Sequence, residues 1–143
     1  MPERQQFSTF FVDGFFFGVE VEKVQEVLRY QQMTRVPLAP PVVRGLINLR
    51  GQIVTALDLR RRLDLSERPA GQLPMNVVIR TDDGGVSLLV DEIGDVVEVD
   101  EGTFERPPDT LKGSARAVIR GVHKLNDRLM HVLDTEKIVN QDS

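Results

Sequence analysis

Residues 42–63 read VVRGLINLRGQIVTALDLRRRL, and the same pattern returns 76 positions later at residues 118–139 as VIRGVHKLNDRLMHVLDTEKIV. Average composition would give only about one or two identities over a stretch of this length. Six positions are identical, and in the first stretch they are Val42, Arg44, Gly45, Leu49, Leu57 and Asp58. The sequence therefore predicts two copies of one small unit.

The region before each stretch also repeats, in a slightly different register. A spacing of 69 residues places Val21, Val24 and Val27 over Val90, Ile93 and Val96. Apolar residues recur here at intervals of three and four, which predicts one or two helical turns in each copy.

Two tight turns predict β-hairpins in the first copy. Asp13-Gly14 separates the runs 7–12 and 15–19, and such a pair tolerates the positive φ values of a hairpin turn. Arg50-Gly51-Gln52 separates two further apolar runs in the same way. Asp58 follows the second of these runs and is placed to cap a short helix that reaches Leu63. Strands should therefore dominate, and helices should be brief.

A segment rich in Pro, Gly and polar residues, residues 64–74, reads as a connecting segment near mid-chain. After it the strand pattern starts again, with strands at 76–80 and 86–90 around a turn at 81–85. Units of this size with short strands protect their edges best by curling into small barrels. We therefore predict one barrel over residues 7–63 and another over residues 75–139, with a shared apolar face and a partner-binding groove between them.

Composition excludes several classes of function. The 143 residues carry 18 Lys and Arg against 22 Asp and Glu, a net charge of −4, and we expect no nucleic-acid partner. There is no cysteine, which excludes disulfides and thiolate nucleophiles. The N-terminus lacks a signal-peptide pattern, and the most apolar stretch, Phe10 to Val21, is interrupted by polar residues. We expect a cytoplasmic protein that does not insert into the membrane.

No catalytic residue, cofactor site or metal site is predicted. Phosphate-cradling glycine motifs are missing, and Ser87 lies on an alternating strand rather than in a nucleophile elbow. His123 and His131 cannot alone form a usual zinc site and are interpreted as structural. The acidic residues between Asp91 and Glu101 lack the spacing of a calcium loop, so we expect them to form a solvated face.

Arg50 is the clearest difference between the two copies, because the second copy has Asn126 at the matching position. Residues that both copies share should build the fold, whereas residues that differ are free to serve function. An arginine at a hairpin tip can pair with a carboxylate of the same chain or of a partner. An exposed arginine that only aids solubility is an equally weighted alternative.

The residues 16–27 and 44–60, which include the motif Asn48-Leu49-Arg50-Gly51, closely resemble the CheW family of chemotaxis coupling proteins. Residues 89–96 and 121–137 resemble the second half of that family, so the resemblance covers about residues 7–139. It implies a single CheW-like domain over residues 1–143. It also implies a mainly β fold of two tandem SH3-like five-stranded β-barrel subdomains with short helices.

The resemblance implies a non-enzymatic adaptor without a cofactor. Its partners would be the cytoplasmic tip of methyl-accepting chemoreceptors and the regulatory domain of a CheA-type histidine kinase, at membrane-associated receptor arrays. The implied receptor-binding residues are Val24, Glu26, Val27 and Arg50. The implied kinase-binding residues are Leu46, Asn48, Leu49, Arg50, Gln52 and Val54. Glu26 is the expected partner of Arg50 within the chain.

Two other hypotheses remain open at this point. The same type of adaptor could serve a chemosensory pathway with a non-flagellar output, for example one linked to pili. A small β-barrel enzyme acting on a sugar or nucleotide is the hypothesis from a different class. Turnover by the purified protein would favour the enzyme, whereas binding without turnover would favour the adaptor.

Overall fold

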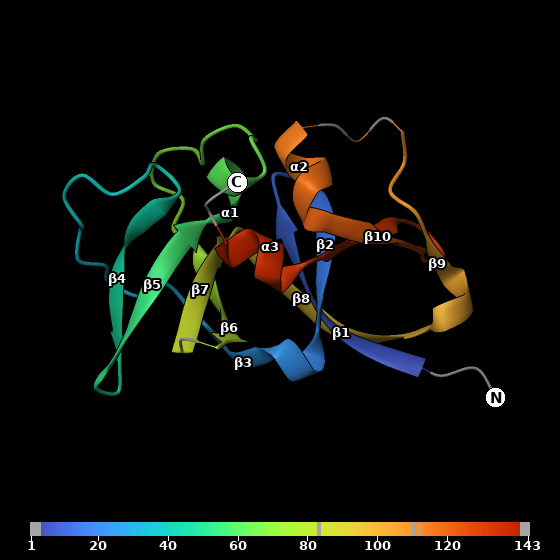
Figure 1. The fold of residues 1–143 in the computed structure, drawn as a ribbon, viewed down its shortest axis with the longest axis horizontal. Helices are drawn as coiled ribbons and strands as arrows, with labels where there is room; N and C mark the ends of the chain where they lie inside the picture. The colour runs from blue at the N-terminus through green and yellow to red at the C-terminus, as the bar shows by residue number, and fades with distance from the viewer. Residues whose placement is uncertain (1–3, 83, 110, 112, 141–143) are drawn as a thin grey trace.

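The computed structural model describes residues 4–82, 84–109, 111 and 113–140. Its fold is mainly β, with two sheets and short helices, which confirms the predicted fold class (Figure 1). Asp83, in the predicted turn at 81–85, lies outside the described residues. The strands are β1 (Arg4–Val12), β2 (Phe15–Glu20), β3 (Val24–Leu28), β4 (Val43–Leu49), β5 (Gln52–Asp58), β6 (Met75–Thr81), β7 (Gly84–Val90), β8 (Glu92–Asp100), β9 (Phe104–Glu105), β10 (Ile119–Lys124) and β11 (Leu129–Leu133). The helical segments are η1 (Val21–Lys23), α1 (Leu59–Arg62), η2 (Glu101–Thr103), α2 (Gly113–Val118) and α3 (Thr135–Val139).

The order of strands reproduces the internal repeat. One sheet runs β8-β1-β2-β11-β10-β9, and the other runs β3-β6-β7-β5-β4. If β1, β2, β3, β4 and β5 are matched to β6, β7, β8, β10 and β11, the two orders are the same apart from β9. The matched pairs also agree in direction, because β2 with β11 and β7 with β5 are both parallel. Each copy therefore supplies the same set of strands.

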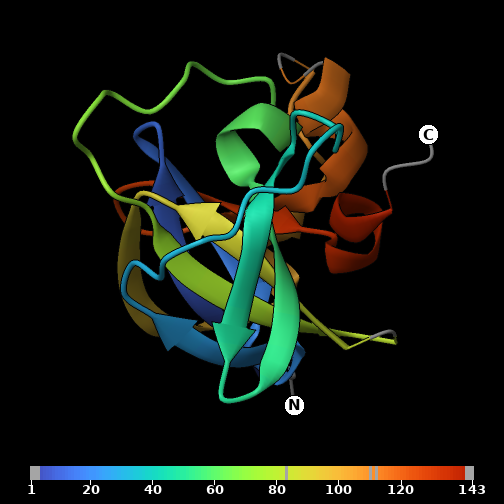
Figure 2. The same ribbon diagram turned by 90° about the vertical axis from the view of Figure 1, so that its left-hand side faces the viewer.

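The sheets do not follow the predicted division into residues 7–63 and 75–139. β1 and β2 belong to the sheet of the second half, and β6 and β7 belong to the sheet of the first half. The first hairpin of each copy therefore pairs with strands of the other copy. Figure 2 shows the second hairpin of the first copy, β4 and β5, in front of the other strands. The sequence could not show this exchange, because a repeat has the same register whether its strands pair within a copy or between copies.

Helical turns were predicted from Val21 and from Ile93 onward, but only η1 forms a helical turn in these two regions, which the structure describes in full. Residues 24–28 form β3 and residues 93–97 belong to β8, so the prediction of helix is wrong there. Both strands contain a β-bulge. In β8, Ser8 pairs with Val96 and Phe10 pairs with Ile93, so two residues face Thr9 alone. A bulge adds one residue and so interrupts the alternation of inward-facing and outward-facing side chains along a strand. Apolar residues then recur three positions apart, as they do in a helix.

The predicted hairpins and caps are confirmed. β1 pairs with β2 around Asp13-Gly14, and β4 pairs with β5 around Arg50-Gly51. The Asp58 side chain accepts a hydrogen bond from the backbone nitrogen of Arg60 and caps α1. Asp134 caps α3 in the same way, so the repeated aspartates serve as helix caps.

The repeated Gly45 and Gly121 allow a close approach of backbone. A Cβ atom on Gly45 would lie 2.6 Å from the carbonyl oxygen of Thr34, and one on Gly121 would clash with that of Glu105. In each copy the preceding loop therefore touches the strand at this point, through the bridge of Thr34 to Leu46 or through β9.

The largest core cluster joins the two sheets. It contains Phe10 and Phe17 from one sheet and Leu57, Val77 and Leu88 from the other. Burial of this many apolar side chains provides the main stabilisation of the fold. The shared apolar face that the repeat predicted is confirmed.

The acidic stretch was expected to be a solvated face, but this is wrong for Asp91, whose side chain is only 8% exposed. The carboxylate lies between β7 and β8, where the chain passes from one sheet to the other. Its Oδ2 lies 2.6 Å from Arg60 Nη2, and its Oδ1 lies 3.0 Å from Arg68 Nη2. The backbone nitrogen of Asp13 donates to it as well, at 2.7 Å. Asp91 therefore connects α1, the connecting segment and the β1–β2 turn.

Candidate protein-interaction site

The β4–β5 hairpin presents Arg50 through a tight turn. Arg50 has a φ of 52° and Gly51 a φ of 87°, the positive values of a type I′ turn. Gly51 takes this conformation without strain, and its backbone nitrogen donates to Asn48 Oδ1 at 2.9 Å. Asn48 and Gly51 therefore stabilise the turn, which explains why both residues occur in the motif Asn48-Leu49-Arg50-Gly51.

Arg50 pairs with Glu26 on β3, as expected from the sequence. The Arg50 side chain is 74% exposed, whereas that of Glu26 is 18% exposed. The hydrogen bond from Arg50 to Glu26 raises the pKa of the guanidinium above its ordinary value. The pair joins the hairpin tip to β3 across the surface and leaves most of the guanidinium open to a partner.

The implied kinase-binding residues divide between the two faces of the hairpin. Asn48 and Gln52 are exposed and Leu46 is half-buried. Leu49 and Val54 are buried in a core cluster with Ile47, Ala56, Val78 and Leu89. These two residues can support a binding surface but do not present atoms to a partner in this structure.

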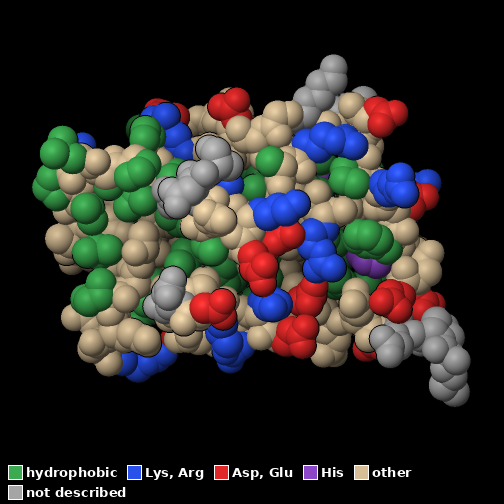
Figure 3. All heavy atoms as spheres, viewed as in Figure 1, with side chains coloured by type: hydrophobic (Ala, Val, Ile, Leu, Met, Phe, Trp, Pro, Cys, Tyr) green, Lys and Arg blue, Asp and Glu red, His purple; other side chains and the backbone are tan. Residues whose placement is uncertain are grey.

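Sequence reasoning missed Ile53, which is 59% exposed on the outward side of β5. The alternation between Ile53 and the buried Val54 was the signal that could have found it, because strand neighbours point to opposite sides. Figure 3 shows hydrophobic side chains gathered at the end of the molecule that β4 and β5 form, whereas charged side chains lie nearer the middle.

The implied receptor-binding residues on β3 have different environments. Val24 is half-buried and packs against the main core, whereas Val27 is 38% exposed. Glu26 lies between them in sequence and is held by Arg50. We use the name hairpin surface for the exposed residues Val27, Arg50 and Ile53 together with Glu26, which pairs with Arg50.

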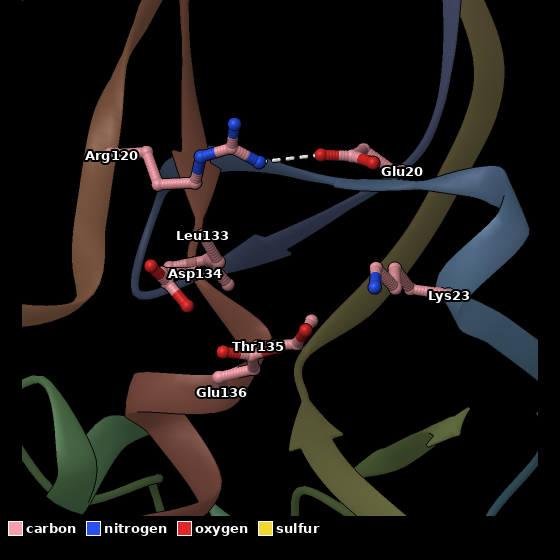
Figure 4. Close-up of a pocket in the computed structure, with 7 residues that line it drawn as sticks. All are labelled: Glu20, Lys23, Arg120, Leu133, Asp134, Thr135 and Glu136. Atoms are coloured by element: carbon pink, nitrogen blue, oxygen red, sulfur yellow. Dashed lines mark hydrogen bonds and ion pairs between the residues drawn. The ribbon is translucent and has the colours of Figure 1, made fainter. Parts of the chain in front are cut away.

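A separate hollow of about 290 Å³ lies between the ends of β2, β10 and β11, the turn η1 and the start of α3 (Figure 4). Arg120 points across it toward Glu20, with which it forms an ion pair. The other residues lining it are Lys23, Leu133, Asp134, Thr135 and Glu136. This hollow is mainly polar and charged, and the implied receptor-binding residues Val24 and Val27 do not line it, so it differs from the predicted partner-binding groove between the two copies.

The repeated arginines have different partners in the two copies. Arg44 donates from Nε to Asp58 Oδ2 at 3.1 Å, whereas Arg120 pairs with Glu20 rather than with the equivalent Asp134. Both arginines occupy a β-bulge, opposite Leu57 or Leu133. Their shared position is structural, as their repetition suggested.

Both histidines have structural surroundings. His123 is buried beside the rings of Phe7 and Phe104, and its Nδ1 lies 2.8 Å from Thr103 Oγ1. Burial lowers the pKa of His123. His131 is half-buried, and its Nδ1 lies 3.0 Å from the carbonyl oxygen of Phe16.

Neither a metal-binding cluster nor a membrane-spanning helix is found in the part of the chain that the structure describes. No group of three or more His, Asp or Glu side chains within residues 4–82, 84–109, 111 and 113–140 is arranged to hold a metal ion. Over the same residues, no helix is both long and apolar enough to cross a bilayer.

Comparison with known proteins gives a consistent result. Residues 6–143 match the family described as the CheW-like domain. The chain is 30% identical over 139 residues to Chemotaxis protein CheW of Bacillus subtilis, a match that covers 97% of this chain and 89% of that protein. It is 27% identical over 113 residues to Protein PilI of Pseudomonas aeruginosa, covering 79% and 64% of the two chains.

A solved structure shares the fold. The crystal structure of scaffolding protein TtCheW from Thermoanaerobacter tengcongensis matches with a TM-score of 0.82 and 26% sequence identity, over 93% of this chain and 89% of that one. The family match spans nearly the whole chain, and the two-sheet fold agrees with it. The chain therefore belongs to the CheW family of scaffold proteins.

Proposed function

We propose that this protein is a non-enzymatic adaptor that couples methyl-accepting chemoreceptors to a CheA-type histidine kinase in the cytoplasm. The observation that carries the proposal is the hairpin surface, in a chain that belongs to the CheW family. An exposed arginine that is paired with Glu26, on a hairpin that also exposes Ile53, is a suitable anchor for a protein interface.

Two partners require two separable areas. We assign the receptor tip to the β3 side, around Val27 and Glu26, and the kinase regulatory domain to the β4–β5 side, around Ile53 and Gln52. Arg50 lies between these areas and is paired with Glu26, so it contributes to both. Recruitment to receptor arrays at the membrane follows from receptor binding and does not require insertion of this chain.

The repeat supplies matched controls for a test of this assignment. Val96 occupies the position equivalent to Val27 in the second copy, and Leu129 occupies the position equivalent to Ile53. Both are exposed, at 60% and 37%. A change in these residues alters an apolar side chain in a comparable strand without touching the hairpin surface.

The experiment measures binding of each variant to a receptor-tip fragment and to the kinase regulatory domain by titration calorimetry. Val27→Lys should weaken receptor binding by about tenfold or more and leave kinase binding nearly unchanged, whereas Ile53→Asp should do the reverse. Val96→Lys and Leu129→Asp should bind both partners as the unmodified protein does. Equal loss of both partners in either hairpin variant, at unchanged melting temperature, would contradict two separable areas.

The relative named Protein PilI supports a second candidate, an adaptor of the same kind in a pathway with a non-flagellar output. The hairpin surface would have the same role in both cases. Deletion of the gene distinguishes them, because swimming through soft agar is lost in the first case and surface movement by pili in the second.

A further inference from the structure

A second open surface lies away from the hairpin tip, between two irregular segments. A groove of about 1130 Å³ separates residues 30–41, which connect β3 to β4, from residues 68–74, which lead into β6. Figure 2 shows both segments at the end of the sheet where α1 lies. Neither Arg50 nor Ile53 lines the groove, so it is distinct from the hairpin surface.

The walls of the groove expose apolar side chains and few backbone donors. Five of the lining residues are prolines, namely Pro37, Pro40, Pro41, Pro69 and Pro74. Proline has no N–H group, so these walls are poorly suited to adding a strand from a partner. Leu38 is fully exposed, and Leu73 and Tyr30 are also exposed. A partner would therefore bind through its side chains, with apolar groups between Leu38 and Leu73.

The charge of the groove has one sign. Arg35, Arg44, Arg61 and Arg68 line it, whereas none of its lining residues is Asp or Glu. Arg68 is buried and paired with Asp91, and Arg44 is paired with the buried Asp58. Arg61 pairs with the exposed Glu67, a contact that solvent weakens. Among the described residues, Arg35 makes no ion pair or hydrogen bond and is exposed.

The positive charge of Arg35, which no carboxylate of the described residues offsets, stands out because the chain as a whole carries a net charge of −4. A protein of that net charge repels nucleic acids and anionic lipid surfaces at long range, whereas a short acidic peptide can approach the groove alone. Charge complementarity of this kind selects a partner and sets its orientation.

We propose that the groove binds a short acidic segment of another protein, with large apolar residues as anchors. The apolar anchors contact Leu38, Leu73 and Tyr30. The carboxylates pair with Arg35 and with the exposed part of Arg44. This surface gives the adaptor a third contact, independent of the hairpin surface.

The test selects short random peptides from a phage-displayed library on the full-length protein and measures the selected peptides by fluorescence anisotropy. The selected peptides should be enriched in Asp, Glu and large apolar residues, and added salt should weaken them. Arg35→Glu and Leu38→Asp should each lower the affinity by about tenfold. Both residues are exposed, so melting temperatures should stay unchanged.

Two variants serve as controls. Arg106→Glu reverses another exposed arginine outside the groove, and Arg50→Glu alters the hairpin surface; both should bind the peptides normally. The proposal is overturned if selection returns no binding peptide, if the peptides show no acidic enrichment, or if Arg35→Glu and Leu38→Asp bind them as well as the unmodified protein. Equal loss in Arg50→Glu would place the peptides on the hairpin surface and would also overturn it. Binding of a single-stranded oligonucleotide or phosphatidylglycerol vesicles that depends on Arg35 would indicate a general anion surface and overturn a peptide-specific groove.

Discussion

Asp91→Asn should destabilise the fold strongly, because Asp91 holds together α1, the connecting segment and the β1–β2 turn. The change removes the negative charge from a site where the side chains of Arg60 and Arg68 are only 7% and 5% exposed. Removing one partner from a buried ion pair costs about 3–5 kcal/mol. Arg60 keeps hydrogen bonds to the carbonyl oxygens of Ser66 and Glu67, which favours the lower end, about 3 kcal/mol.

For a chain of this size, about 3 kcal/mol corresponds to a fall in melting temperature of about 6–12 °C. Thermal and urea unfolding at neutral pH, followed by circular dichroism, measure the effect. Glu92→Gln is the matched control, since Glu92 is the next residue and is exposed. A melting temperature of Asp91→Asn within 2 °C or so of the control would refute the structural role of this carboxylate.

The same site predicts a dependence on pH. Burial disfavours the charged form of Asp91, but hydrogen bonds from Arg60, from the backbone of Asp13 and from Arg68 outweigh it and lower its pKa. A lowered pKa contributes stability that is present above the unfolded value, near pH 4, and is lost as the pH falls through the folded value. The difference between Asp91→Asn and the unmodified protein should therefore narrow in acid, and a difference that widens below pH 4 would contradict this sign.

The remaining predictions concern His123, Gly121 and Arg50. Burial lowers the pKa of His123, so as the pH drops below about 6.5 the unfolded chain binds a proton before the folded chain does, and the free energy of unfolding should fall. His123→Phe should remove this part of the pH dependence measured by urea unfolding, and an unchanged pH dependence would argue against the role of His123. Gly121→Ala should lower the free energy of unfolding by about 1–3 kcal/mol, because the added Cβ forces β9 away from β10. Gly102 has open space around it, so Gly102→Ala should lower the free energy of unfolding little, and equal melting temperatures of the two variants would show that the close approach at Gly121 is unimportant. Arg50→Glu should leave the melting temperature nearly unchanged because the side chain is exposed, and a fall of many degrees would make Arg50 structural.

The repeat made much of the fold predictable. Asp13-Gly14 and Arg50-Gly51 identified their hairpins because turn chemistry is local, and Asp58 identified a helix start for the same reason. Pairing of β3 with β6 and of β8 with β1 was not predictable, because it depends on contacts between the copies. The bulges in β3 and β8 then produced a spacing that favours a helix in isolation.

The candidate site was predictable to a similar degree. The difference between Arg50 and Asn126 identified the functional candidate, and the expected pair with Glu26 is present. The burial of Leu49 and Val54 and the exposure of Ile53 required the orientation of the hairpin. Asp91 lies in an acidic stretch, and only the folded chain brings Arg60 and Arg68 to it.

Coupling of receptors to a kinase through the hairpin surface can be measured as kinase activation in a reconstituted mixture of receptor, CheA-type kinase and this protein. The unmodified protein and Asn126→Glu should raise receptor-dependent autophosphorylation of the kinase, whereas Arg50→Glu should fold normally and fail to raise it. The double reversal Glu26→Arg with Arg50→Glu restores activation if the pair itself is what matters, and stays inactive if Arg50 meets a carboxylate of a partner. Full activation by a normally folded Arg50→Glu would show that Arg50 is not needed for coupling.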